Sequence, residues 1–205
     1  MSSAKPVSHT AQSDQAFRGS GAFVQGARVD YRQLLGHHDE AASSLGGVVV
    51  LGGPRGVGKG SLLREMRREL SQSGRLVLFG RGEPAQAVPY GALKEPASQA
   101  LSFLESRGLA ERFFDNHARA LGVLLPGLSP PSQSGQRARD KMAFFEDLRA
   151  FFIDLAAQVP LTLLLADLHH ADNDTRDVIR FLAAHLFVAH GTGRQDTRDL
   201  SLIHI

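Results

Sequence analysis

A glycine-rich loop between an apolar run and a helical pattern constrains this chain more than any other feature. The apolar run is residues 48–51, and the loop follows it and ends at Lys59. A strand, a loop of the pattern G-x-x-x-x-G-K and a helix, in that order, are typical of a phosphate-binding P-loop. The glycines let the backbone turn its N–H groups toward an anion, and the helix N-terminus and the lysine add positive charge. The sequence therefore predicts a site for a nucleoside triphosphate.

The predicted binding residues lie in the loop and at the start of the helix after it. They are Gly53, Pro54, Arg55, Gly56, Val57, Gly58, Lys59, Gly60 and Ser61. In most P-loops a Ser or Thr follows the lysine and its hydroxyl binds Mg²⁺, whereas here Gly60 follows and Ser61 comes one residue later. One helical step rotates a side chain by about 100°, so Ser61 needs a shifted backbone to serve as the metal ligand. A glycine-rich turn that binds nothing is the alternative, which the lysine and the strand–loop–helix order disfavour.

Alternating apolar runs and helical patterns predict an α/β fold with a parallel sheet. Two more buried strands are predicted at residues 76–79 and 161–166, with Asp167 directly after the second one. Helical patterns occur at residues 31–35, 61–71, 93–104, 111–125, 144–155 and 173–189. Residues 80–90 and 126–136 are predicted as loops, and Asp172 as the N-cap of the last helix. Ligands bind such sheets at the carboxyl ends of the strands, where the P-loop and Asp167 both fall. An acid at this edge holds Mg²⁺ or polarises an attacking water, so Asp167 is the candidate catalytic residue and metal ligand.

Composition excludes several classes of protein. The chain has 205 residues, 42% of them hydrophobic and 21% charged, which suits one soluble domain. Its net charge is +2 without a long basic run, so we expect no direct nucleic-acid binding. It has no cysteine, which excludes a disulfide scaffold, and no apolar stretch long enough to cross a membrane. Residues 1–21 are polar and lack the apolar core of a secretion signal; we predict a disordered leader and a cytoplasmic location.

Four segments together resemble one known family. Residues 167–172 (DLHHAD) resemble the D-D-L-H-W-A-D segment of the signal-transduction ATPases with numerous domains, the STAND branch of AAA+-like NTPases. Residues 23–28 resemble that family's F-V-G-R entry motif, residues 53–63 its G-x-x-G-x-G-K-[ST]-x-L-L motif, and residues 89–90 its P-Y element. The resemblance implies a three-layer P-loop NTPase domain over residues 22–190. It implies ATP, less readily GTP, as the ligand with Mg²⁺, and a regulatory switch in signal transduction or transcription regulation within a longer chain that can self-associate.

Two departures from the family pattern concern the metal. The Walker A hydroxyl of the family falls on Gly60, and its first Walker B aspartate falls on Ala166, which leaves Asp167 as the remaining acid. Phosphoryl transfer depends mainly on positioning and charge neutralisation. Hydrolysis should therefore suffer more than nucleotide binding, and whether the chain is an active ATP hydrolase stays open.

Two other functions fit parts of the pattern. Nucleoside monophosphate kinases resemble G-G-P-x-G-K-G-[ST], with a glycine after the lysine, and are active; no acceptor-binding segment or lid is recognisable here, however. A degenerate P-loop scaffold without catalysis is favoured by Gly60 and Ala166 and disfavoured by the intact Lys59. A metal site built on the histidine pairs 37–38 and 169–170 is disfavoured, because no further ligands join them at suitable spacing.

The stretch 191–205 differs from what precedes it. In the resembled family a sensor strand, a fifth strand and an arginine finger follow the position of residue 190, and none is recognisable here. We expect residues 191–205 to form an atypical tail related to truncation. We also expect the fold to be incomplete at its C-terminus. The sensor strand of that family lies between the P-loop strand and the Walker B strand, and residues 200–205 alternate in a way that predicts a substitute strand at this place.

Overall fold

Five parallel strands form one sheet at the centre of the protein. The computed structural model describes residues 21–25, 47–52, 58–83, 88–125, 127, 137–185 and 200–204, of which 21–25, 47–52, 137–140 and 200–204 are described by their backbone. The strands are β1 (Gly21–Gln25), β2 (Gly47–Gly52), β3 (Leu76–Arg81), β4 (Leu161–Ala166) and β5 (Leu200–His204). Their order across the sheet is β1-β2-β5-β4-β3, and every neighbouring pair is parallel. This architecture confirms the predicted α/β class with a parallel sheet.

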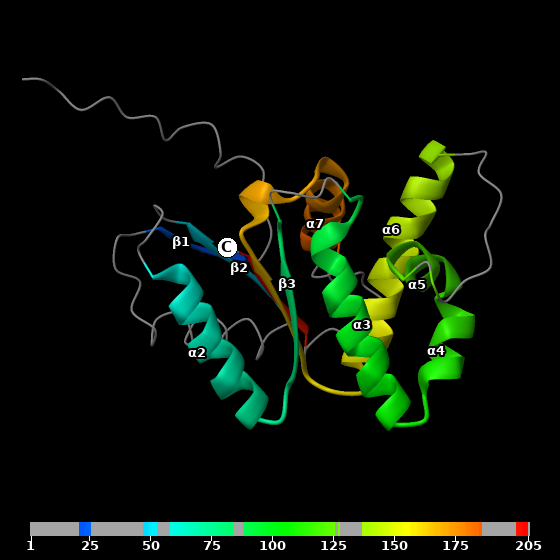
Figure 1. Ribbon diagram of the computed structural model, residues 1–205, viewed down its shortest axis with the longest axis horizontal. Coiled ribbons are helices and arrows are strands. Elements are labelled where there is room, and N and C mark those ends of the chain that lie inside the picture. Colours follow the sequence, from blue (N-terminus) through cyan, green and yellow to red (C-terminus); the bar gives the residue numbers. More distant parts are fainter. Residues whose placement is uncertain are drawn as a thin grey trace, which may run out of the picture.

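Helices lie on both sides of this sheet (Figure 1). They are α2 (Lys59–Gln72), α3 (Gly91–Ser106), α4 (Ala110–Asn116), α5 (Ala118–Leu124), α6 (Arg137–Ala156) and α7 (Asn173–His185), with a short 3₁₀ turn, η2 (Leu168–His170). Figure 1 shows α2 on one side of β3 and α3, followed by α5 and α6, on the other. None of the described helices is long and apolar enough to cross a membrane.

Strand β4 shows why both sides are covered. All six of its residues are buried, and they alternate between two hydrophobic clusters. Leu163 and Leu165 belong to a cluster with α3, α5, α6 and α7, whereas Leu164 and Ala166 pack with Leu63, Met66 and Leu70 of α2. A strand buried on both faces has no polar side to present to water, which explains its near-continuous apolar sequence.

The predicted strands are confirmed, with one addition and one correction. Strands β2, β3 and β4 occupy the predicted positions, but Gly80 and Arg81 belong to β3 and not to the loop predicted from residue 80. Strand β1 was not predicted, and its first residue, Gly21, is also the last residue of the predicted leader. Residues 200–204 form β5 between β2 and β4, as expected for the substitute strand. The predicted incompleteness of the fold stays a prediction.

The single helix predicted for residues 111–125 is wrong. Two helices, α4 and α5, meet at His117, whose backbone (φ −125°, ψ 35°) is not helical. The buried His117 ring lies between two carboxylates of α6, with Nδ1 3.1 Å from Asp147 Oδ1 and Nε2 3.1 Å from Asp154 Oδ2. Asp147 also accepts the backbone N–H of Ala120 at 2.8 Å, so it caps the N-terminus of α5 from another helix. The break is thus a tertiary contact that helical periodicity does not reveal.

The other helix predictions hold where the structure describes them. Helix α6 begins at Arg137, earlier than the predicted 144, and α7 is described up to His185 of the predicted 173–189. The predicted helix at 31–35 and most of the predicted loop at 126–136 lie outside the described residues.

Candidate functional site

The described part of the P-loop is its junction with α2. Gly58 is the N-cap residue of α2 and has a left-handed backbone (φ 94°, ψ 10°), a conformation that a side chain disfavours. Lys59 is the first residue of the helix, so it stands at the helix end that carries partial positive charge. The loop residues Gly53, Pro54, Arg55, Gly56 and Val57 lie outside the described part of the chain.

Gly60 and Ser61 decide whether the first turn of α2 can bind a metal. Among the described residues, a Cβ built on Gly60 would meet only the end of the Arg64 side chain, at 3.8 Å, so none of these residues blocks a side chain there. The Ser61 hydroxyl accepts a hydrogen bond from Arg64 Nη2 at 2.9 Å. The predicted metal ligand is therefore engaged within its own helix, in an exposed contact that a cation can displace at small cost.

Strand β2, which leads into the glycine-rich loop, ends at the same edge of the sheet as β4, which Asp167 follows. In the register, Val50 of β2 pairs with His204 of β5, which pairs in turn with Leu165 of β4. The loop begins after Gly52 and Asp167 follows Ala166, so both leave the sheet at nearly the same level. One strand lies between them, and neighbouring strands are about 4.8 Å apart. The backbones that carry the loop and the acid are thus about 10 Å apart across the sheet.

Asp167 is held by an arginine from the neighbouring strand tip. Arg81, the last residue of β3, donates from Nε to Asp167 Oδ2 at 2.7 Å. The Arg81 side chain is 63% exposed and that of Asp167 29% exposed. Exposed ion pairs contribute only about 0.2–1 kcal/mol, so this contact orients the carboxylate without removing it from use. No sequence signal pointed to Arg81, because the two residues are far apart in the chain.

A tight turn follows Asp167 and packs against Gly82. Asp167 has a left-handed backbone (φ 52°, ψ 37°), and its carbonyl oxygen accepts the N–H of His170 at 2.9 Å. A Cβ on Gly82 would lie 2.5 Å from the Asp167 carbonyl oxygen and 2.8 Å from the Ala171 nitrogen. Only glycine permits this approach, because those atoms are backbone and cannot rotate away.

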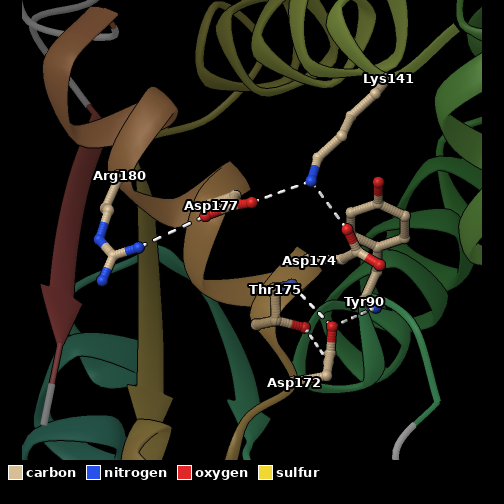
Figure 2. Close-up of polar contacts among 7 residues, drawn as sticks. All are labelled: Tyr90, Lys141, Asp172, Asp174, Thr175, Asp177 and Arg180. Atoms are coloured by element: carbon tan, nitrogen blue, oxygen red, sulfur yellow. Dashed lines mark hydrogen bonds and ion pairs between the residues drawn. The ribbon is translucent and has the colours of Figure 1, made fainter. Parts of the chain in front are cut away.

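Asp172 ends the turn and joins two helices (Figure 2). Oδ1 accepts the Thr175 N–H at 2.8 Å and Oδ2 the Thr175 hydroxyl at 2.5 Å, which confirms the N-cap of α7 predicted from the sequence. Its oxygens also accept the N–H groups of Tyr90 and Gly91, at 3.2 and 3.3 Å, where α3 begins. Burial raises the pKa of the Asp172 carboxyl, but these hydrogen bonds outweigh burial and hold the pKa below its usual value.

The sequence profile of the AAA ATPase domain family matches residues 26–191, most of the chain. The protein belongs to this family. Neither the curated proteins nor the solved structures that were compared with it gave a match. Membership in the AAA ATPase domain family supports a nucleotide-binding P-loop NTPase, and Mg²⁺ is the usual companion of the nucleotide in such domains.

A second ion-pair cluster braces the same region of the AAA ATPase domain. Lys141 of α6 reaches Asp174 Oδ1 at 2.8 Å and Asp177 Oδ2 at 2.9 Å, both on α7 (Figure 2). Hydrogen bonds to Asp174 and then Asp177 raise the pKa of Lys141 above its usual value, and the bond from Lys141 lowers the pKa of Asp177. Together with Asp172, these contacts connect α3, α6 and α7 near the turn that follows Asp167.

A pocket of about 220 Å³ opens beside the turn, between the tip of β3 and the N-terminus of α3. Its walls include Arg81, Gly82, Lys94, His170 and Asp172. Arg81 and Gly82 fall in the predicted loop 80–90, and no sequence pattern connects them with Asp167.

Proposed function

We propose that this AAA ATPase domain binds ATP and works as a nucleotide-dependent regulatory switch of the STAND type, in signal transduction or transcription regulation. The observation that supports the proposal is that β2, which leads into the glycine-rich loop, and β4, which Asp167 follows, end at one edge of a parallel sheet within a chain of this family. The three-layer P-loop NTPase architecture and the cytoplasmic location remain predictions. So do the predicted partners, which are further domains of a longer chain and self-association.

The loop residues 53–61 would surround the phosphates, with Lys59 as the positive point charge. The chemistry of the donor set fits Mg²⁺, since the Ser61 hydroxyl and the Asp167 carboxylate are oxygen ligands at the same edge. Mg²⁺, when bound, neutralises the charge of the triphosphate. Each of the two oxygens also has an arginine partner, Arg64 or Arg81, with which the metal would compete.

These arginine contacts, with Gly60 and Ala166, support binding without efficient turnover. They also favour the second candidate function, a P-loop scaffold that has lost its metal chemistry. The two candidates differ in one measurable property: a switch responds to ATP, and a pure scaffold does not.

Thermal unfolding of the 205-residue chain with ATP tests the proposal. A ligand that binds only the folded state at one hundred times its Kd adds about 2.7 kcal/mol. For a domain of this size that corresponds to a rise in Tm of about 5–10 °C. We expect this rise in the wild type and its loss in Lys59→Ala. An unchanged Tm in the wild type at millimolar ATP would reject nucleotide binding and leave the scaffold.

The dependence of ATP binding and turnover on Mg²⁺ distinguishes an active ATPase from a domain that only binds the nucleotide. Repeating the titration with chelator measures how much of the ATP affinity needs the metal, and phosphate release measures turnover. We expect a small contribution from Mg²⁺ and slow turnover, because two metal-organising positions have changed. Turnover at the rate of an ordinary ATPase would contradict the expected defect.

A further inference from the structure

The turn between Asp167 and Asp172 is fixed at both ends. At its start, Arg81 binds the Asp167 carboxylate at 2.7 Å, and the Gly82 N–H donates to the Ala166 carbonyl at 2.9 Å. At its end, the Asp172 carboxylate receives backbone N–H groups from the first residues of α3. Within it, the His170 N–H donates to the Asp167 carbonyl at 2.9 Å and the Ala171 N–H to the Leu168 carbonyl at 3.1 Å, so internal hydrogen bonds connect its two ends.

Asp172 makes more contacts than capping a helix requires. An N-cap residue needs one oxygen that accepts an N–H in the first turn, and Thr175 provides that donor. The bonds from Tyr90 and Gly91 add a link to α3, a helix far away in the chain. Figure 2 shows the bonds from Thr175 and the bond from Tyr90 converging on this one carboxylate.

The backbone of Asp167 explains why this link matters. Its left-handed conformation (φ 52°) costs about 1–2 kcal/mol for most residues with a side chain and less for Asp. Such a conformation persists only where the surrounding contacts enforce it. If the far end of the turn is released, Asp167 can return to a right-handed conformation, and its Cβ then points in a different direction.

We propose that Asp172 is a positioning residue for Asp167: by binding the end of the turn between the two residues to the N-terminus of α3, it sets the direction of the Asp167 carboxylate. The inference rests on the proposed function for its consequence, because a misdirected Asp167 would weaken Mg²⁺ binding beside ATP. Asp172 itself does not touch the nucleotide and acts through the turn.

The decisive variant is Asp172→Ser, which separates capping from positioning. Serine is a good N-cap residue, so α7 keeps its cap. Its single, shorter oxygen cannot also hold the N–H groups of Tyr90 and Gly91. The readout is the Mg²⁺ gain, which is the Kd for ATP with chelator divided by the Kd with Mg²⁺. Removing a residue that orients a metal ligand typically lowers metal affinity about 10–100-fold. We therefore expect Asp172→Ser to remove most of the Mg²⁺ gain that the wild type shows, which brings the ratio close to one.

A double-mutant cycle shows whether the effect passes through Asp167. Asp167→Asn alone should remove most of the Mg²⁺ gain, and Asp172→Ser in that background should then change nothing further. Equal losses in both backgrounds, or no loss in the otherwise wild-type chain, would overturn the proposal. Lys141→Met is the matched control: it breaks contacts to α7 without touching the turn and should leave the gain unchanged.

A measurement without nucleotide keeps this inference separate from the proposed function. The NMR resonance of the Arg81 Nε–H reports its hydrogen bond to Asp167 directly. We expect this resonance to move in Asp172→Ser and to stay in place in Lys141→Met. If the wild type does not bind ATP, the proposed function fails while this resonance still decides the positioning role; an unmoved resonance in Asp172→Ser refutes it.

Discussion

Gly82→Ala should destabilise the protein although it adds only one methyl group. The new Cβ would lie 2.5 Å from the Asp167 carbonyl oxygen and 2.8 Å from the Ala171 nitrogen, where ordinary contacts begin at 3.4 Å. The strand β3 and the turn must therefore move apart by nearly an ångström. Overpacking of this kind costs about 1–3 kcal/mol, and the Gly82 N–H bond to Ala166 contributes about 1 kcal/mol more if it breaks.

Urea unfolding measures this cost, and Gly60→Ala is its control. At Gly60, within a helix, the added Cβ meets no described atom closer than the end of the Arg64 side chain at 3.8 Å. Replacing glycine by alanine in a helix gains up to about 1 kcal/mol. The two variants carry the same chemical change, so their midpoints should move in opposite directions. A Gly82→Ala midpoint equal to that of the wild type would refute the close approach of β3 and the turn.

Three further predictions concern the metal, pH and the core. Gly60→Thr restores a hydroxyl at the family's position, where there is room for it, and should raise the Mg²⁺ gain in ATP titrations; no rise would show that Ala166 is the limiting change. Because the folded-state pKa values of Asp172 and Asp177 are depressed, the stability they contribute is present above their usual value of 3.8 and is lost as the pH falls below it. Acid unfolding of Asp172→Asn should accordingly be less steep below this pH, and equal steepness would contradict the assignment. Phe151 is fully buried among aromatic rings. Replacing it by alanine should lower the free energy of unfolding, measured in urea, by about 3–5 kcal/mol; a loss below 1 kcal/mol would contradict its place in the core.

Local patterns were enough to predict the elements that bury apolar runs. The apolar runs before the glycine-rich loop and before Asp167 predicted β2 and β4, since strands covered on both faces must be apolar throughout. The N-cap role of Asp172 also followed from the sequence, because capping is decided within four residues. Strand β1 was missed because its five residues (GAFVQ) are too few to show a period.

Contacts between distant segments could not be predicted in this way. Nothing near His117 in the sequence indicates that carboxylates of α6 will divide the predicted helix. Likewise, the Arg81 contact to Asp167 and the link from Asp172 to Gly91 depend on how β3, β4 and α3 pack. Such contacts follow from the tertiary fold and not from periodicity, so sequence reasoning located the acid but not what orients it.

The central position of β5 has a consequence for how this sheet assembles. Gly47 of β2 pairs with Ser201 of β5, and Leu161 of β4 pairs with Leu200, so the strand that joins the two halves is the latest of the described strands to be synthesised. Until it arrives, β2 and β4 each present an unpaired edge, and the contacts between β2 and β5 join residues separated by most of the chain. Pairings between such distant segments slow folding and leave edges exposed to other chains. During synthesis the edges of β2 and β4 should therefore stay unpaired until residues 200–204 leave the ribosome, and the nascent domain should need protection from aggregation until then.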